Sequence, residues 1–136
     1  MKQTDLVSYH FAILRVVPHV HLGPFVNIGV VLHARTAEYL GIRRIIDPVH
    51  LRERVQDVDL EILHRYLDCY DGICNGDPLS GPLSRLPRSE RFHWLTAPRS
   101  DVLQMSAIHE GLSADPGRAL QELFEQFVIG VRAVGA

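Results

Sequence analysis

The chain has few cysteines and lacks the motifs that mark phosphate loops, redox centres and serine nucleophiles. Its two cysteines, Cys69 and Cys74, have a spacing that fits neither a zinc knuckle nor a Cys-x-x-Cys redox pair. No G-x-x-x-x-G-K, G-x-G-x-x-G or G-x-S-x-G segment occurs. Because no signal peptide precedes the cysteines, we expect reduced thiols in a cytoplasmic protein, and we expect no cofactor.

Long apolar runs and an excess of positive charge are also missing. The longest apolar runs, at residues 11–17 and 28–32, are far shorter than the roughly 20 residues that a transmembrane helix needs. The formal net charge is -2, whereas duplex binding depends on neutralising phosphates with lysine and arginine. The sequence therefore predicts no membrane span and disfavours nucleic-acid binding.

The composition is that of an ordinary globular domain. The chain has 136 residues, of which 46% are hydrophobic and 22% are charged. A chain of this size can bury a core without disulfides or metal ions. Since we find no internal repeat and no interdomain linker, we expect one α+β domain over residues 1–136.

Three segments in the first third of the chain are typical of β-strands. Residues 9–17, 25–33 and 38–46 are rich in β-branched and aromatic residues, and short connections separate them. Short connections favour an antiparallel β-meander. The even positions of the second segment are uniformly apolar, and we expect the C-terminal helix to pack on them. These positions are Val26, Ile28, Val30 and Leu32.

The predicted sheet is apolar on its second face as well. The residues on that face are Leu14, Val16, Leu40, Ile42 and Ile46. A sheet that is apolar on both sides must be covered on both sides. Two alternatives are open: a helix predicted over residues 57–70 covers the second face, or the face binds another chain and buries about 800 Å² per subunit.

Two helices are predicted after the third strand. An aspartate followed by proline at residues 47–48 is typical of a helix start, and this helix should end near Val55. Asp57 should open a second helix, which Gly72 or Gly76 ends.

A second β-hairpin and a C-terminal helix are predicted in the rest of the chain. We interpret residues 90–96 and 102–108 as two strands that pair with each other. An aspartate and a proline at residues 115–116 open the last helix. Its apolar stripe contains Leu120, Leu123, Phe124, Phe127, Val128 and Val131. The predicted fold is therefore α+β, an antiparallel β-meander plus a second β-hairpin, packed with about three helices.

Polar residues gather around the predicted second hairpin. Arg91 and His93 would share one face, and Arg99 at the turn could hold an anion in bidentate fashion. His93 or His109 could act as a base, with Ser106 as a hydroxyl partner. The alternative is a structural network that ties the hairpin to the meander. Elsewhere, His19 and His21 could approach a metal ion, but spacing sets no third ligand, and we predict no metal site.

Asn27 and Gly29 interrupt an otherwise apolar strand. Both residue types are poor strand formers, and a glycine inside a strand often marks a bulge. A buried Asn27 would need a hydrogen-bonding partner, and Arg15 on the neighbouring strand is a candidate. We expect the two arginines of the second hairpin, Arg91 and Arg99, to approach Arg15 and Asn27.

The residues that carry these features resemble a bacterial family known as domain of unknown function 3037. The resemblance covers residues 9–18, 23–32 and 91–100, together with Gln104, Ser106 and His109. Pro24 departs from the family pattern, in which an acidic residue is common at this place. The resemblance implies no established activity. It implies a protein partner, because such proteins are similar to companions of kinases that resemble the HipA toxins.

Our leading hypothesis is a non-enzymatic accessory or binding protein that acts through a protein partner, such as a HipA-like kinase, or as a homodimer. The alternative is a small enzyme that acts on an anionic or phosphorylated substrate with a histidine base and an arginine clamp. A third hypothesis is single-stranded nucleic-acid binding through Phe92 and Trp94, although a hydrophobic core explains both residues. The candidate anion-binding residues are Arg15, Asn27, Arg91, His93, Arg99, Ser106 and His109.

Overall fold

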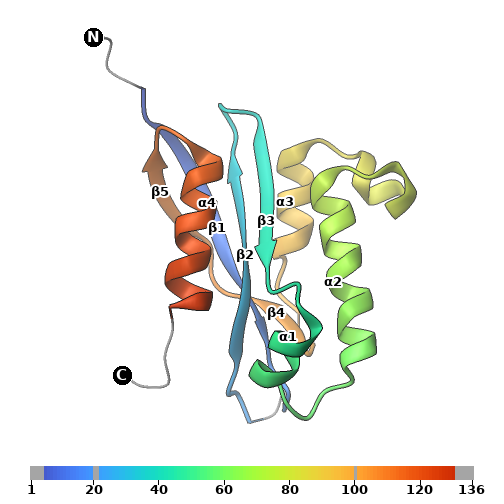
Figure 1. Ribbon diagram of the computed structural model, residues 1–136. Helices are drawn as coiled ribbons and strands as arrows, with labels where there is room; N and C mark the ends of the chain where they lie inside the picture. Colours follow the sequence, from blue (N-terminus) through green and yellow to red (C-terminus); the bar gives the residue numbers. More distant parts are fainter. Residues whose placement is uncertain (1–4, 20–21, 100, 131–136) are drawn as a thin grey trace.

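Five strands form one antiparallel sheet in the computed structural model, which describes residues 5–19, 22–99 and 101–130. The strands are β1 (Val7–Val16), β2 (Val26–Ala34), β3 (Tyr39–Arg44), β4 (Leu103–Met105) and β5 (His109–Ser113). The order across the sheet is β3-β2-β1-β4, and β5 pairs with the same edge of β1 as β4 does (Figure 1). The predicted meander and the α+β class are confirmed.

Four α-helices accompany the sheet in the described residues. They are α1 (Pro48–Arg54), α2 (Leu60–Asn75), α3 (Arg88–Thr96) and α4 (Pro116–Phe124), which continues as a π-helical turn, η3 (Glu125–Ile129). Two 3₁₀ turns, η1 (Pro78–Ser80) and η2 (Pro82–Arg85), connect α2 to α3. Of the helices described, none is both long and apolar enough to cross a membrane.

Local signals set most of the helix ends. The Asp47 carboxylate accepts from the Val49 N–H, and a proline follows it as the first helical residue. Asp59, rather than the expected Asp57, caps α2 by accepting from the N–H groups of Glu61 and Ile62. Gly76 ends the same helix in the left-handed conformation, with φ of 70°.

The predicted strand over residues 90–96 is wrong, because this segment is helix α3. Its buried residues are Arg91, Phe92, Leu95 and Thr96, and this spacing follows one side of a helix rather than one side of a strand. The second hairpin is therefore absent from the described residues. The segment after it forms β4 and β5, which pair one after the other along β1.

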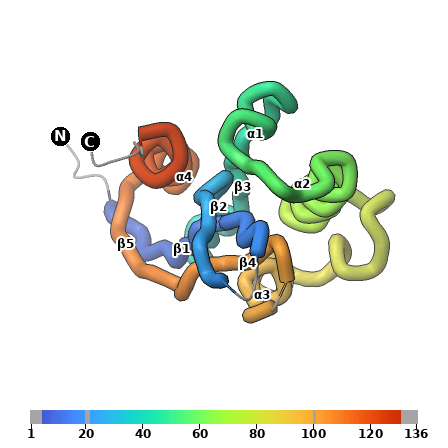
Figure 2. The backbone as a smooth tube through the Cα atoms, turned by 90° about the horizontal axis from the view of Figure 1, so that it is seen from below, coloured from blue at the N-terminus to red at the C-terminus, as the bar shows by residue number. Residues whose placement is uncertain are grey.

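The sheet has helices on both faces. On the first, here called the α4 face, Arg43 bonds to Gln121 of α4, and the ring centroids of Phe11 and Phe127 lie 6.2 Å apart. On the second, the α2 face, Arg44 pairs with Asp71 of α2 at 2.8 Å. Figure 2 shows α4 and α2 on opposite sides of β2 and β3.

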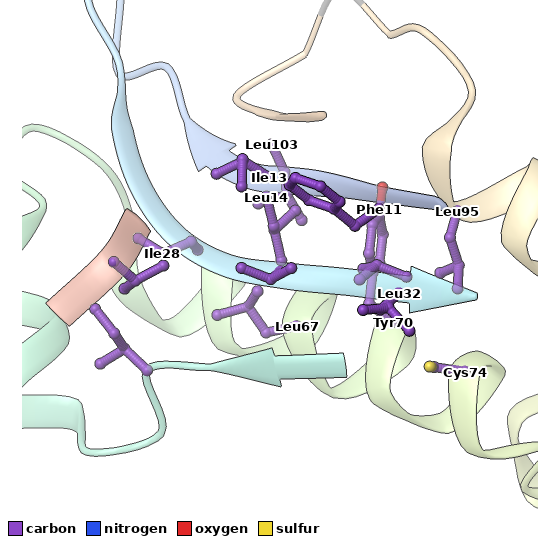
Figure 3. Close-up of a cluster of buried hydrophobic side chains, with 14 of the residues drawn as sticks. Phe11, Ile13, Leu14, Ile28, Leu32, Leu67, Tyr70, Cys74, Leu95 and Leu103 are labelled. Atoms are coloured by element: carbon purple, nitrogen blue, oxygen red, sulfur yellow. The ribbon is translucent and has the colours of Figure 1, made fainter. Parts of the chain in front are cut away.

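For Leu14 and Val16, the second face of the predicted sheet is covered within the chain and not by another chain. Both side chains are fully buried within the chain, so neither forms an exposed patch for another subunit. Ile46 lies beyond the end of β3 and is 70% exposed, so it is not part of the sheet. The core between the sheet and α2 includes Leu67 and Cys74 (Figure 3). Burial raises the pKa of the Cys74 thiol to about 12, so this thiol stays protonated.

A β-bulge at Ile28 reverses the faces on which the first residues of β2 were expected to lie. Leu14 pairs with Gly29 and Arg15 pairs with Asn27, so Ile28 is an extra residue in β2. The glycine signal for a bulge is confirmed. The expected packing of α4 holds for the face that bears Val30 and Leu32, but it is wrong for Val26, which pairs with Val16 on the α2 face. Val131 of the predicted stripe lies outside the described residues.

Candidate functional site

The predicted site residues do not converge in one place. Arg15 and Asn27 are neighbours on the α4 face, whereas Arg91, His93 and Arg99 belong to α3 and its end, beside α2. Ser106 and His109 lie along the edge of β1 that binds β4 and β5. The expectation that Arg91 and Arg99 approach Arg15 and Asn27 is therefore wrong. The role of these residues in anion binding stays a prediction.

Arg15 lies in a polar row that crosses three strands. It pairs with Asn27 of β2 on one side and with Gln104 of β4 on the other. Its guanidinium carbon lies 3.8 Å from the ring centroid of Phe25, and burial lowers the pKa of this arginine. The Asn27 side-chain amide donates to the carbonyl of Phe127 at 3.1 Å. Among the described residues, the Arg15 Nε and the Asn27 Oδ1 are buried without a hydrogen-bond partner, and so is the Arg91 Nε elsewhere in the fold.

Arg91 is a buried connector between α3 and the end of α2. Its Nη1 donates to the carbonyls of Ile73 and Ser84, each at 3.5 Å. A Cβ at Gly76 would lie 2.6 Å from this Nη1, so the glycine is needed for the close approach as well as for its positive φ. These contacts give Arg91 a structural role.

Arg99 caps the C-terminal end of α3. Its Nη2 donates to the Trp94 carbonyl at 2.9 Å, and its Nη1 donates to the carbonyls of Leu95 and Ala97 at 3.4 Å. The guanidinium carbon lies 4.4 Å from the Trp94 ring centroid and 5.7 Å from that of Tyr70. Burial raises the pKa of the Tyr70 hydroxyl, and the charge of Arg99 acts in the opposite direction. The arginine is positioned by helix carbonyls and aromatic rings, as expected near a helix C-terminus.

Ser106 fills the gap between β4 and β5. Its Oγ accepts from the Ile13 N–H at 2.8 Å and donates to the Ala107 carbonyl at 2.8 Å. The Ser106 hydroxyl, which was the candidate partner of a histidine base, is thus already hydrogen-bonded to main-chain groups. His93 and His109 are both exposed, and the His109 ring stacks on Phe11 with centroids 5.3 Å apart.

Of the two histidines in the first connection, the structure describes only His19. His19 Nε2 lies 3.3 Å from the Asp57 carboxylate, and His21 is outside the described residues. Within residues 5–19, 22–99 and 101–130, no three His, Cys, Asp or Glu side chains are grouped closely enough to hold a metal ion.

A groove along α2 is the feature that the sequence reasoning missed. Two pockets of about 320 and 210 Å³ adjoin each other, and both are lined by Tyr66 and Asp101. The first is also lined by Pro18, Val58, Ile62, Leu63 and Val102, and the second by Cys69, Tyr70, Trp94, Arg99 and Leu103. We call these two pockets together the α2 groove.

One wall of the α2 groove is a second apolar stripe on α2. Leu63, Leu67 and Tyr70 point into the core, while Ile62 and Tyr66 are 44% and 48% exposed. Since Ile62 and Tyr66 are four residues apart, they lie on the same side of the helix. The signal for this stripe was present in the sequence, but only the fold shows that the stripe borders a groove.

The rim of the α2 groove is acidic. Asp57 and Asp59 line the first pocket, and Asp101 lines both. All three carboxylates are exposed. Arg99 is the cation that lines the groove, and its donors already bond to helix carbonyls. The arrangement can therefore bind an apolar side chain and place a positive charge beside it.

Comparison with known sequences identifies a family. A sequence-family model described as a protein of unknown function, DUF3037, matches residues 11–128. No curated protein and no solved structure matches the chain.

Proposed function

The chain belongs to the DUF3037 family, and from this premise we propose that it is a non-enzymatic accessory protein that binds a protein partner through the α2 groove. The observation that carries the proposal is the exposed apolar stripe of Ile62 and Tyr66 beside an apolar groove. Soluble proteins seldom leave large contiguous apolar patches exposed, and such patches often mark binding sites.

The residue types of the α2 groove support a protein partner. Tyrosine, tryptophan and arginine are the residues that most often contribute the largest binding energies in protein interfaces. Tyr66, Trp94 and Arg99 all line the groove. Arg99 is held by three carbonyl contacts and two rings, so binding would not have to immobilise this long side chain.

The acidic rim favours a partner with lysine or arginine beside an apolar side chain. Asp57, Asp59 and Asp101 surround the groove, and opposite charges across an interface raise the association rate and the specificity. A kinase similar to the HipA toxins is the first partner to test, and a second copy of the chain is the second. The alternative of an enzyme with an arginine clamp gains no support from Arg91, whose Nη1 contacts main-chain carbonyls.

The test compares two single substitutions in full-length protein. Tyr66→Glu adds a charge to the apolar stripe, and Gln126→Glu adds the same charge to an exposed position of η3. Titration calorimetry against a purified HipA-like kinase should show a loss of affinity of about tenfold or more for Tyr66→Glu and little change for Gln126→Glu. Sedimentation of the chain alone tests self-association in the same way. Equal behaviour of the two variants in both assays would refute the proposal.

A further inference from the structure

The outer edge of β3 presents unpaired backbone groups. β3 is at one end of the sheet, and β2 is its neighbour on the other side. The Ile45 N–H donates to the Ile28 carbonyl at 2.9 Å, which sets the register of the ladder. Because ladder bonds alternate along an antiparallel pair, the N–H and C=O groups of Leu40 and Ile42 point away from β2. In the described residues, no further strand pairs on that side.

A groove runs along this edge. A pocket of about 380 Å³ is lined by five consecutive residues of the strand, from Tyr39 to Arg43. Gly117, Leu120 and Gln121 of α4 also line it, and so does Asn75 at the end of α2. Figure 1 shows β3 between these two helices. Five strand residues span about 17 Å, which is the length of a short extended peptide.

Gly41 allows the helix wall to approach the strand closely. A Cβ at this position would lie 2.5 Å from the Tyr39 hydroxyl oxygen and 2.9 Å from a methyl group of Leu120. The absence of a side chain leaves room over the strand for the Tyr39 ring and for Leu120 of α4, so the groove has a helix along one side and a strand edge as its floor. Peptides that add a strand to a sheet bind in grooves of this kind, with affinity from main-chain hydrogen bonds.

Arg43 supplies a charge at the end of the groove. It is exposed, and its Nε and Nη2 both donate to a single oxygen, the Oε1 of Gln121, the Nε contact measuring 2.6 Å. The next residue, Arg44, instead pairs with Asp68 and Asp71 at 3.0 and 2.8 Å. Among the described carboxylates, none forms an ion pair with Arg43. A carboxylate would accept from this guanidinium more strongly than a neutral amide does.

We propose that the β3 edge binds an extended segment of a partner protein, which adds a strand to the sheet and places an aspartate or glutamate beside Arg43. A second copy of the chain fits less well, because its own β3 carries Arg43 and Arg44 and no carboxylate. This surface is distinct from the α2 groove, since the two share no lining residue. The inference therefore does not depend on the proposed function.

The first experiment selects peptides from a phage-displayed library of random heptapeptides on the immobilised full-length chain. The expected result is a family of peptides with alternating β-branched residues and one acidic residue. Failure to enrich any sequence, or enrichment only of sequences without an acidic residue, would overturn the proposal.

The second experiment uses the best selected peptide with N-methyl groups at alternate amides. Methylation in the register that faces β3 should weaken binding by about tenfold or more, whereas methylation in the other register should leave it nearly unchanged. This comparison changes no residue of the protein, so folding cannot affect the result. Equal sensitivity of the two registers would overturn strand addition.

The third experiment pairs Arg43→Gln with a matched control, Arg118→Gln on the exposed side of α4. Arg43→Gln should weaken the acidic peptide about tenfold, and changing the peptide's acidic residue to its amide should have no further effect in that variant. Arg118→Gln should bind as the wild type does.

Loss of peptide binding in Tyr66→Glu with retention in Arg43→Gln would place the peptide in the α2 groove and overturn the proposal. A dimer in sedimentation that the peptide dissociates would identify a second copy as the occupant, and would also overturn it.

Discussion

Two of the described arginines lie against aromatic rings, but their surroundings differ. On the α2 face, Arg99 stacks on Trp94 and donates to three carbonyls at the end of α3. On the α4 face, Arg15 stacks on Phe25, and its Nε has no hydrogen-bond partner among the described residues. The difference follows from secondary structure. The last turn of a helix leaves carbonyls without intrahelical partners, whereas a strand inside a sheet has its carbonyls paired on both sides.

Arg91 combines the two situations, because its Nη1 donates to two carbonyls whereas its Nε, like that of Arg15, is buried without a hydrogen-bond partner among the described residues. Its truncation should show the largest effect, because Arg91 is buried and the other two arginines are only half-buried. Arg91→Ala removes a buried side chain and leaves the carbonyls of Ile73 and Ser84 without this donor. We expect the free energy of unfolding to fall by about 2–4 kcal/mol, measured by urea denaturation. Arg88→Ala, an exposed change on the same helix, should stay within about 0.5 kcal/mol of wild type. A similarly small effect of Arg91→Ala would show that its contacts do not stabilise the fold.

Arg99→Ala should have the next largest effect. It removes the cap of α3 and the stacking on Trp94, and we expect a loss of about 1–2 kcal/mol. Arg85→Ala, an exposed change in η2, is the control. The anion hypothesis predicts another pattern: a variant as stable as the wild type that no longer gains thermal stability from added phosphate. That result would contradict the structural role of Arg99.

The buried thiol of Cys74, which lies near Arg91, should make the free energy of unfolding depend on pH. Burial is the main cause that raises the pKa of Cys74, from 9.0 to about 12, and the nearby Arg91 lowers it. Between about pH 9 and 12, the thiol ionises in the unfolded chain but stays protonated in the fold, so the stability that is present below pH 9 is lost as the pH rises.

At pH 10 this linkage should lower the free energy of unfolding by roughly 1 kcal/mol relative to pH 8.5. Cys74→Val should remove most of this pH dependence in urea denaturation, whereas Cys69→Ser should retain it, because Cys69 is exposed. If the wild type and Cys74→Val lose stability in parallel over this range, the thiol is not the responsible group.

The parts of the fold that depend on neighbouring residues could be predicted from the sequence. Asp47 and Asp115 each precede a proline and cap a helix, and the capping bond joins residues two or three apart. The three strands of the meander have short connections, so their pairing followed from chain order. Gly29 gave a correct signal for the bulge, because a glycine is rare in a strand without such a reason.

The parts that depend on contacts between distant residues could not be predicted in the same way. Phe92, Trp94 and Thr96 are strand-favouring residues, and they suggested alternation, but packing against α2 placed them on a helix. The α2 groove combines Tyr66 with Trp94 and Val102, which approach only when the sheet and helices have assembled. The Asn27 side-chain N–H donates to the carbonyl of Phe127, which is 100 residues away in the chain, and the Asn27 Oδ1 accepts no hydrogen bond from Arg15.

Arg15 should show the smallest effect, and its sign is informative. Arg15→Leu loses the stacking on Phe25 but also removes a desolvated cation whose Nε is buried and unpaired. The two contributions oppose each other, because burying a polar donor without a partner costs about 1–3 kcal/mol. We therefore expect the free energy of unfolding to stay within about 1 kcal/mol of wild type. Arg35→Leu, at an exposed position after β2, is the control for the loss of one charge. A loss above about 2 kcal/mol in Arg15→Leu would mean that its guanidinium is as well bonded as that of Arg99, and the contrast between the two faces would not hold.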